Sequence, residues 1–297
     1  MKELNDYINY LKINRNYSLY TIKNYELDIT DFINFCNDKK IKINKVKYDE
    51  VKAYLLILHN KKYKSSTISR KLSSIRNFYS YLYDNEVVDK NIFKNLPSPK
   101  KDRKLPKFVT GDDIDILFSI PDTSSALGQR NRLILEMLYS TGIRVSELCN
   151  IKINDIDFNN KSIKILGKGS KERIVLYGDI CDKILKMYLD DGRNILLNGK
   201  NNEYLIVGLN RKESLSTRSV ELIIDDIIRK ASLNKNVTPH VFRHTFATHL
   251  LNEGCDILIV KELLGHSSLD TTGIYTHISN ERLRNVYLNS HPRAKGK

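Results

Sequence analysis

The stretch Thr238-Pro-His-Val-Phe-Arg-His-Thr-Phe-Ala-Thr-His249 is the most informative part of this 297-residue sequence. Proline suits the first position of a helix and Thr238 can cap it, so the pattern predicts a helix that begins at Pro239. His240 and Arg243 are three residues apart and therefore project from one face near the positive end of that helix. An imidazole and a guanidinium at a helix N-terminus form a candidate phosphate site with a built-in proton donor or acceptor.

The same stretch contains two histidines with the spacing of metal ligands on a helix. His240 and His244 are four residues apart. No glutamate follows His240 as in the H-E-x-x-H pattern, and no acidic residue lies between His240 and His249. We therefore expect no metal here, and core or surface positions for His244 and His249. A metallohydrolase that uses His240 and His244 is an alternative that resistance to chelators would exclude.

The segment Ser140–Leu148 (STGIRVSEL) places a second arginine beside an acid. Arg144 follows Gly142, which ends a helix predicted over residues 127–141, and Glu147 lies three residues later. An Arg–Glu pair at this spacing is compatible with a structural ion pair. It is equally compatible with a phosphate ligand, in which Glu147 orients the planar guanidinium of Arg144 for a bidentate contact.

Two further segments contain isolated candidates. Alternating apolar residues predict strands over Ser162–Leu166 and Arg173–Tyr177, joined by a glycine-containing turn with Lys168 at its tip. Near the end of the chain, His266 follows a helix-ending glycine, and Tyr275 lies nine residues further on. A lysine at a hairpin tip is usually solvated, and one tyrosine among 17 usually packs, so neither residue alone indicates a function.

The excess positive charge is concentrated in the first third of the chain. Lys and Arg outnumber Asp and Glu by 49 to 35, a net charge of +14. Residues 1–110 contribute 23 − 12 = +11, whereas residues 111–297 contribute 26 − 23 = +3. A basic domain beside a nearly neutral one indicates a polyanion-binding module attached to a domain with another task. The alternative is that the abundant Lys and Asn reflect genome composition.

Prolines and periodicity divide the chain into two domains. Residues 1–95 show helical patterns, with caps expected at Ser18 and at Ser65 or Ser66, and residues 96–110 (LPSPKKDRKLPKFVT) form a basic, proline-containing linker. We expect phosphate contacts from one solvated face of the last amino-terminal helix and from the linker. The residues concerned are Arg70, Lys71 and Arg76 on the helix, and Lys100, Lys101, Arg103 and Lys104 in the linker.

Beyond the linker, the sequence predicts a domain of helices around the hairpin. A helix opens at Thr110 or Asp112. Further helices are predicted over residues 180–190, 217–231, 239–253, 256–264 and 280–288, with a short strand over Tyr204–Val207.

Composition argues against several classes of protein. The longest apolar runs are far shorter than the ~18 residues that span a bilayer, and the N-terminus has no apolar signal segment. Cys36, Cys149, Cys181 and Cys255 lie tens of residues apart without a C-x-x-C pair, which argues against a zinc ribbon, a redox pair or a disulfide scaffold. We expect a cytoplasmic protein with no membrane segment.

Taken together, these segments resemble the tyrosine recombinases, also called the phage-integrase family. The motifs occur in the order Arg144, Lys168 within GKGSKER, His240-x-x-Arg243 within HVFRHTFATHLL, His266 within LGHSS and Tyr275 within TTGIYTH. The resemblance covers essentially the whole chain, and residues 65–82 (SSTISRKLSSIRNFYSYL) are similar to the family's core-binding domain. The length and the ending His291-Pro-Arg-Ala294 point to the Xer subgroup, which resolves chromosome dimers at a dif-type site during cell division.

The resemblance implies a fold and a chemistry. The fold is mainly α with a small antiparallel β-sheet. It is a C-shaped, two-domain DNA clamp, with a helical core-binding domain over residues 1–95, the linker over 96–110 and a catalytic domain over 111–297. The chemistry is like that of type IB topoisomerases. Tyr275 attacks the scissile phosphate, to which His266 donates a hydrogen bond, and forms a 3′-phosphotyrosyl bond without metal, ATP or another cofactor.

The resemblance also implies a role for each remaining site residue. Arg144 and Arg243 neutralise the charge that develops on the non-bridging phosphate oxygens. Glu147 does not contact the phosphate itself but orients the guanidinium of Arg144. Lys168 protonates the departing 5′-oxygen, and His240 transfers a proton to or from the tyrosine.

The expected partners follow from the same resemblance. The family acts on double-stranded DNA as a tetramer, through a Holliday junction, and a related Xer recombinase and a septal DNA translocase are usual partners of the subgroup. The helix over residues 280–288 would pack into a neighbouring subunit, and packing on its own domain is the alternative. Competing functions are an integrase of a mobile element with the same chemistry and a non-catalytic DNA-binding protein. The complete catalytic set argues against the second.

The acid role of Lys168 can be tested with a modified leaving group. Lys168→Ala should slow cleavage of ordinary DNA far more than cleavage of DNA with a 5′-thiol leaving group, because a good leaving group needs no proton. Cleavage rates on the two substrates, measured side by side, decide the matter. An equal loss on both would contradict the role.

Overall fold

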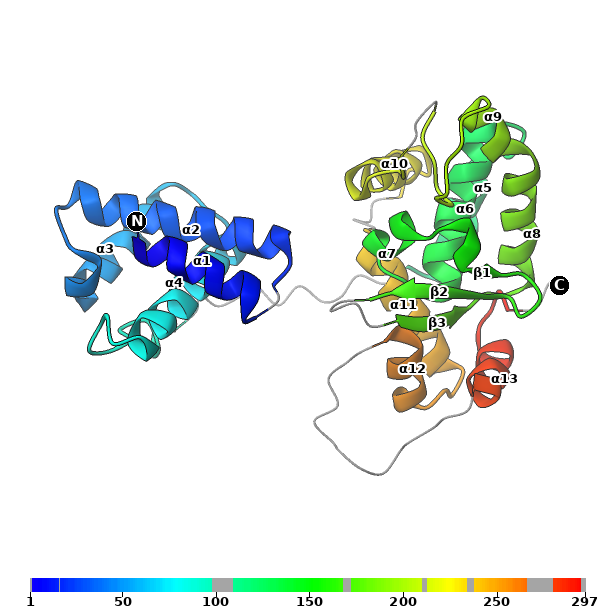
Figure 1. Ribbon diagram of the computed structural model, residues 1–297. Coiled ribbons are helices and arrows are strands. Elements are labelled where there is room, and N and C mark those ends of the chain that lie inside the picture. The colour runs from blue at the N-terminus through cyan, green and yellow to red at the C-terminus, as the bar shows by residue number, and fades with distance from the viewer. Residues whose placement is uncertain are drawn as a thin grey trace. The chain divides into compact units, whose positions relative to one another are not determined.

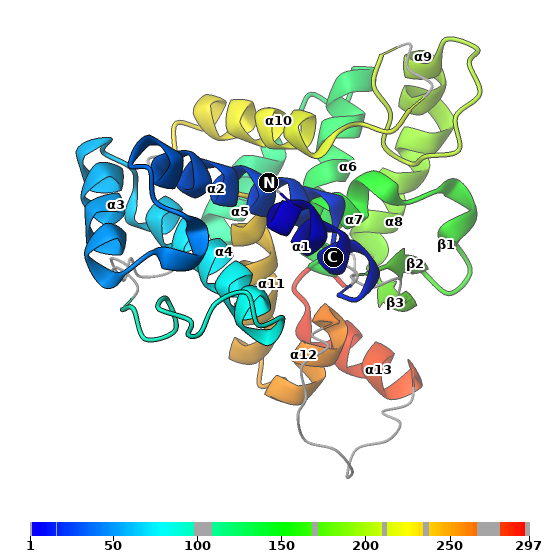
Figure 2. The same ribbon diagram turned by 60° about the vertical axis from the view of Figure 1, so that its left-hand side comes forward.

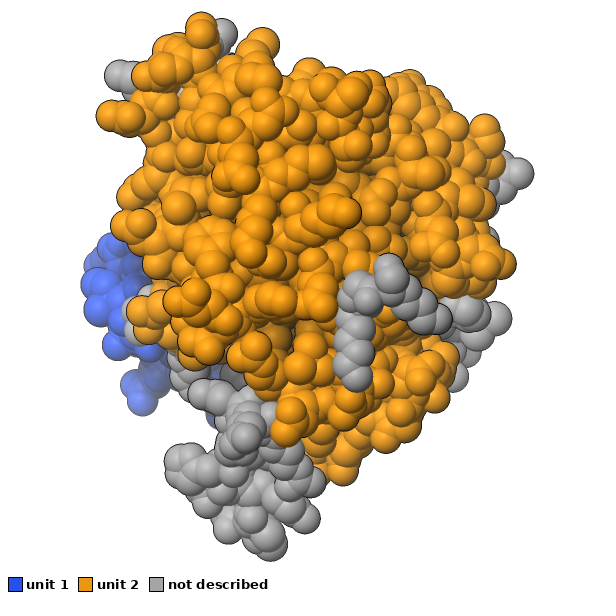
Figure 3. Space-filling model, turned by 90° about the vertical axis from the view of Figure 1, so that its right-hand side faces the viewer, with its two compact units in different colours: residues 1–104 blue, residues 105–297 orange. Residues whose placement is uncertain are grey.

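The computed structural model describes residues 2–15, 17–97, 109–167, 172–209, 213–233, 238–265 and 280–294. The chain forms two compact units, residues 1–104 and 105–297, coloured blue and orange in Figure 3. Each unit has its own hydrophobic core. Among the described residues, no helix is both long and apolar enough to cross a membrane.

The described part of the amino-terminal unit is helical, as its periodicity predicts. Its elements are α1 (Lys2–Ile13), α2 (Leu19–Asp38), the 3₁₀ turn η1 (Ile43–Lys45), α3 (Tyr48–Asn60) and α4 (Ser65–Asp84). Ser18 caps α2 as expected, because its hydroxyl accepts a hydrogen bond from the backbone N–H of Thr21 at 3.2 Å. The cap expected at Ser65 or Ser66 is wrong, since Lys64 holds that position and Ser65 is already helical.

Aromatic side chains hold α2, α3 and α4 together. The ring centroid of Phe32 lies 5.0 Å from that of Tyr54 and 5.5 Å from that of Phe93, while Tyr79 lies 4.6 Å from Phe93. All four side chains are buried. Tilted and edge-on pairs at such distances stabilise a core by about 0.5–1.5 kcal/mol each beyond the area they bury.

The basic face expected on α4 is not a row of solvated cations. Lys71 is only 4% exposed, and its ammonium lies 3.2 Å from Asp28 and 2.5 Å from Asp31. Asp28 is itself buried and also accepts hydrogen bonds from Arg70 and from the hydroxyl of Ser74. The expectation of a solvated Lys71 is therefore wrong, because this side chain neutralises a carboxylate in the core.

Arg76 is also engaged within its own unit. Its Nε donates to the carbonyl of Phe93 and its Nη2 to the carbonyl of Leu96, both at 2.9 Å. These bonds hold the segment that follows α4 against the helix. Arg76 is half-buried, and only Arg70 of the three expected phosphate ligands is exposed.

The carboxylate of Asp28 should therefore be critical for stability. Asp28→Ala should destabilise the amino-terminal unit by about 3–5 kcal/mol, because it removes one partner of a buried ion pair. Asp49→Ala is the matched control, since the Asp49–Lys52 pair is exposed and such pairs contribute at most about 1 kcal/mol. Urea unfolding followed by circular dichroism measures both, and equal stability of the two variants would contradict the assignment.

The carboxy-terminal unit combines helices with a small antiparallel sheet. Its elements are α5 (Gly111–Ser119), α6 (Ala126–Thr141), α7 (Val145–Asn150), η2 (Ile153–Asp155), β1 (Ile156–Asp157), β2 (Ser162–Leu166), β3 (Glu172–Leu176), α8 (Asp179–Met187), the π-helical turn η4 (Tyr188–Gly192), α9 (Arg193–Leu197), α10 (Thr217–Lys230), α11 (Pro239–Asn252), α12 (Ile257–Leu264) and α13 (Asn280–Ser290). Thr110 caps α5, one of the two starts expected for that helix.

The central helix of this unit is α6. It lies against α5, α8 and α11 (Figures 1 and 2), and most of its residues are buried. Glu136 is fully buried but accepts hydrogen bonds from Arg132 at 2.9 Å and from Arg293 at 2.7 Å, so its charge is paired. Gly142 ends the helix, as the sequence predicts.

The predicted hairpin is present, with an additional strand. The sheet has the order β1-β2-β3, all antiparallel, and its register pairs Ile165 with Arg173. The two-residue strand β1 was not predicted, because a run that short has no readable alternation. The strand expected over Tyr204–Val207 is wrong, since these residues form only isolated bridges, Lys152 with Tyr204 and Val207 with Ser214.

Helix α13 packs on its own unit in the single chain. Tyr287 is 1% exposed and belongs to an apolar cluster with residues of α11 and α12. The ring of His291 stacks on Tyr287 with centroids 5.2 Å apart. In the single chain, α13 therefore packs on its own domain, which was the alternative to packing into a neighbouring subunit.

Candidate active site

Arg144 and Glu147 are joined at the start of α7. Arg144 is the N-cap residue, and its backbone N–H donates to one carboxylate oxygen of Glu147 at 2.8 Å. Its Nη1 donates to the other oxygen, also at 2.8 Å. A glutamate three residues after the cap commonly reaches back in this way, so the local sequence fixes the pair. The side chain of Arg144 is still 38% exposed, which leaves its outer edge open to a ligand.

A second arginine binds the same carboxylate from the hairpin. Arg173 of β3 donates from Nη1 and Nη2 to the two oxygens of Glu147, at 2.9 and 2.8 Å. Arg173 is not among the residues that the sequence predicts for the site. The available signal was its position in the strand, where it shares the inward face with the buried Val175. A cation at an inward position needs a buried acid, and Glu147 is that acid.

The two arginines keep Glu147 ionised although its side chain is only 5% exposed. Burial alone would raise its pKa. The hydrogen bonds from Arg173 and Arg144, together with their positive charges, outweigh burial and lower the pKa of Glu147 to about 2. The carboxylate is therefore charged throughout the neutral range.

Arg243 on α11 is held by the ends of two helices. Its Nη1 donates to the carbonyl of Gly142 at 2.5 Å, and its Nη2 donates to the carbonyl of Leu264 at 2.7 Å. Burial and the nearby charge of Arg144 lower the pKa of Arg243 to about 10, so it stays protonated at neutral pH. Gly142 has a φ of +62°, and a Cβ there would lie 2.7 Å from the ring of Phe246. Glycine is therefore required where α6 ends beside Arg243.

Arg144, His240 and Arg243 line one cleft of about 510 Å³. His240 is exposed on the first turn of α11, where Thr238 occupies the N-cap position without a side-chain capping bond. The cleft is also lined by residues of α10, namely Thr217, Arg218, Glu221 and Asp225. Three of the expected site residues thus converge, with Glu147 bonded to one of them. The four arginines at the cleft (Arg144, Arg173, Arg218 and Arg243) outnumber its three carboxylates (Glu147, Glu221 and Asp225) by 4 − 3 = +1, and a net positive charge suits a phosphodiester.

The remaining expected site residues lie outside the described residues. They are Lys168, His266 and Tyr275 of the catalytic set, and Lys100, Lys101, Arg103 and Lys104 of the linker. The described neighbours of two of them border the site. Lys168 belongs to the connection between β2 and β3, and His266 follows Gly265, which ends α12 with a φ of +65°.

Comparisons with known proteins show the family. A family model described as "Phage integrase family" matches residues 107–282, which is more than half of the chain. A second, described as "Phage integrase, N-terminal SAM-like domain", matches residues 4–86. The chain belongs to the phage integrase family.

Its similar relatives are Xer recombinases. Tyrosine recombinase XerC of Anoxybacillus flavithermus is 46% identical over 293 residues, 98% of each chain. Tyrosine recombinase XerC of Staphylococcus epidermidis is 42% identical over 287 residues, 96% of this chain and 95% of the relative. Among solved structures, XerH site-specific recombinase bound to palindromic difH substrate, a post-cleavage complex, is 26% identical with a TM-score of 0.69, covering 92% of this chain and 81% of that one. The predicted family, Xer subgroup and mainly helical fold with a small sheet are confirmed.

The other histidines of α11 have different surroundings. The ring Nδ1 of His249 lies 2.6 Å from the hydroxyl of Tyr139, and burial lowers the pKa of His249. His244 is exposed. Within the described part of this recombinase, no group of three His, Cys, Asp or Glu side chains is placed to hold a metal ion.

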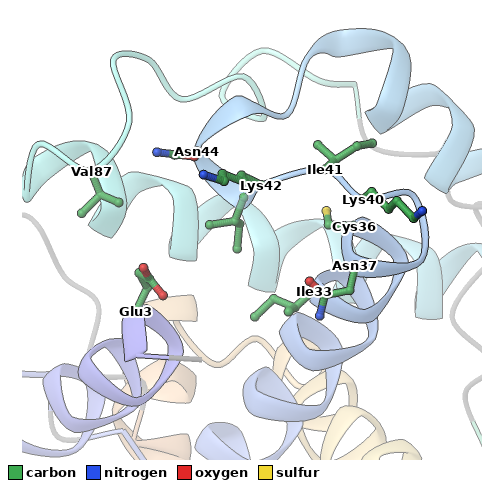
Figure 4. Close-up of a pocket in the computed structure, with 10 residues that line it drawn as sticks. Glu3, Ile33, Cys36, Asn37, Lys40, Ile41, Lys42, Asn44 and Val87 are labelled. Carbon is green, nitrogen blue, oxygen red and sulfur yellow. The ribbon is translucent and has the colours of Figure 1, made fainter.

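A second pocket, in the amino-terminal unit, has no comparable chemistry. It measures about 460 Å³ and is lined by α1, α2 and the segments that follow α2 and α4, with Glu3, Lys40 and Lys42 as its charged residues (Figure 4). Cys36 also lines it, but burial raises the pKa of this thiol to about 11, so the reactive thiolate is scarce at neutral pH. The candidate active site is therefore the cleft of the carboxy-terminal unit.

The lowered pKa of Glu147 predicts how its contribution to stability depends on pH. A depression from 4.5 to about 2 corresponds to about 3 kcal/mol at neutral pH. Because the folded-state value is the lower one, this stabilisation is full above about pH 4.5 and is lost as the pH falls toward 2. Glu147→Gln should therefore be most destabilising at pH 7, and its deficit in unfolding free energy should shrink by roughly half by pH 3 and approach zero only near pH 2.

Unfolding free energies of the two proteins between pH 7 and pH 3 test this. Glu203→Gln is the control, because Glu203 forms an exposed pair with Lys152. A wild-type advantage over Glu147→Gln that did not change with pH would contradict the paired, ionised state of Glu147.

Proposed function

We propose that this site-specific tyrosine recombinase cuts and rejoins DNA with Tyr275 as its nucleophile and resolves chromosome dimers at a dif-type site during cell division. The observation that carries the proposal is the convergence of Arg144, His240 and Arg243 on one cleft, with Glu147 bonded to Arg144. Two XerC relatives match at 42–46% identity over nearly their whole length, which favours this role over that of a mobile-element integrase.

The arginines account for catalysis at the phosphate. Attack by Tyr275 places extra negative charge on the non-bridging oxygens of a phosphodiester. Arg144 and Arg243 provide two fixed positive charges at the cleft, already oriented by Glu147 and by backbone carbonyls. Such preorganised donors stabilise the transition state without reorganisation, and loss of one costs about 10²–10³-fold in rate.

The proton transfers and the covalent step complete the reaction. His240 exchanges a proton with Tyr275, Lys168 protonates the 5′-oxygen as it leaves, and His266 donates a hydrogen bond to the phosphate. The products are a 3′-phosphotyrosyl bond and a free 5′-hydroxyl. Because that bond retains the energy of the phosphodiester, the reverse attack by a 5′-hydroxyl rejoins DNA without ATP. No step requires a metal or cofactor.

DNA binding and assembly extend the proposal beyond the cleft. The basic amino-terminal unit and the linker cations Lys100, Lys101, Arg103 and Lys104 would contact phosphates of the duplex. Arg70 is exposed and can join them after leaving Asp28, whereas the internal bonds of Lys71 and Arg76 favour structural roles. We further propose a tetramer of this chain, or of this chain and a related recombinase, a cytoplasmic location and coupling to a septal DNA translocase.

Adduct formation on a suicide substrate tests the proposed function. A duplex with a nick beside a dif-like core should trap a covalent protein–DNA adduct in the presence of EDTA, visible on a denaturing gel. Tyr275→Phe should bind the same duplex but form no adduct, because the nucleophilic hydroxyl is gone. A duplex with a scrambled core is the control for site specificity.

Each other outcome has a defined meaning. An adduct that persists in Tyr275→Phe would show that another residue is the nucleophile. DNA binding by the wild-type protein without an adduct would contradict autonomous cleavage. An adduct that formed equally well on the scrambled core would contradict the dif-type role while leaving the chemistry intact.

A further inference from the structure

Arg173 is the more buried of the two cations bonded to Glu147. Its side chain is 16% exposed, compared with 38% for Arg144, which binds the same carboxylate. The more exposed arginine is the one able to reach a bound phosphate. Arg173 lies on the inward face of β3, so its role in the reaction has to be exerted through another residue.

The two arginines share both oxygens of Glu147. One oxygen accepts from the Nη1 atoms of Arg144 and Arg173, and the other accepts from the Arg144 backbone N–H and Arg173 Nη2. A bidentate guanidinium fixes the plane of a carboxylate, which a single-point donor does not. The position of the Arg144 guanidinium therefore depends on the carboxylate plane that Arg173 sets.

Arg173 also contacts the end of α12. A Cβ on Gly265 would lie 2.5 Å from Cδ and 2.7 Å from Nε of Arg173. The aliphatic part of the Arg173 side chain thus occupies the space that a side chain at position 265 would fill. Gly265 directly precedes His266, and β3 follows the connection that contains Lys168. Arg173 thus extends from the hairpin and contacts both α7, through Glu147, and the end of α12, at Gly265.

We infer that Arg173 is a positioning residue for DNA cleavage, which orients Arg144 through the carboxylate of Glu147 and fixes the end of α12 against the hairpin. This inference rests on the proposed function of the cleft. It adds to that function a residue that never touches the phosphate and whose loss is felt mainly through Arg144.

A double-mutant cycle with Arg144 separates positioning from simple structural support. Arg173→Gln should lower the single-turnover cleavage rate at saturating DNA by about 10- to 100-fold, the range for partners that orient a functional ligand. The dissociation constant for DNA should change little, because Arg173 makes no contact with DNA. In the Arg144→Ala background, Arg173→Gln should lower the rate much less than it does in the wild type, since its main target is gone and only its contact with the end of α12 remains.

Two further variants keep the test decisive if Arg173→Gln folds poorly. Arg173→Lys retains the charge but lacks the planar fork, so it should also cleave slowly while its thermal unfolding stays near that of the wild type. Lys164→Gln is the matched control on the same hairpin, because Lys164 forms an exposed pair with Glu172, and it should cleave at the wild-type rate.

The results distinguish this inference from the proposed function. Multiplicative effects of Arg144→Ala and Arg173→Gln, or a wild-type cleavage rate in Arg173→Lys, would overturn the positioning role. If the wild-type protein itself forms no adduct, the proposed function fails first. If it forms the adduct and Arg173→Gln forms it at the same rate, only the present inference fails.

Discussion

The carboxylate of Glu147 binds two guanidiniums at once, and the geometry of the cleft depends on it. A buried carboxylate without partners would take up a proton, and two arginines without an anion between them would repel each other. Each carboxylate oxygen of Glu147 accepts one hydrogen bond from Arg144 and one from Arg173. The result is a rigid arrangement in which Arg144 keeps one edge open. An additional cation, Arg243, is held independently by the carbonyls of Gly142 and Leu264.

The same principle of internal pairing governs the rest of the molecule. In the amino-terminal unit, Asp28 binds cations from α4, and in the carboxy-terminal unit Glu136 binds Arg132 and Arg293. A net charge of +14 therefore does not make every cation available to DNA. Buried cations are paired with acids inside the protein, whereas exposed cations remain available to a ligand. Residue type alone does not distinguish the two.

Much of the fold could be read from the sequence, because it depends on local signals. Ser18 caps the start of α2 and Gly142 ends α6, as expected, and the alternation of apolar residues predicts the hairpin correctly. Ion pairs between residues far apart in the sequence cannot be predicted from such local signals. Lys71 has the spacing of a surface lysine, and only the fold brings it to a carboxylate 40 residues away. The pairing of Arg173 is equally hidden in the sequence, since its partner Glu147 is 26 residues distant.

The most direct test of the account is a crystal structure of the full-length Tyr275→Phe protein bound to an uncleaved dif-like duplex. We expect Arg144 and Arg243 to donate to non-bridging oxygens of the scissile phosphate while Arg144 and Arg173 both remain bonded to Glu147. A structure in which Arg144 leaves Glu147 to reach the phosphate, or in which the phosphate binds outside this cleft, would contradict it.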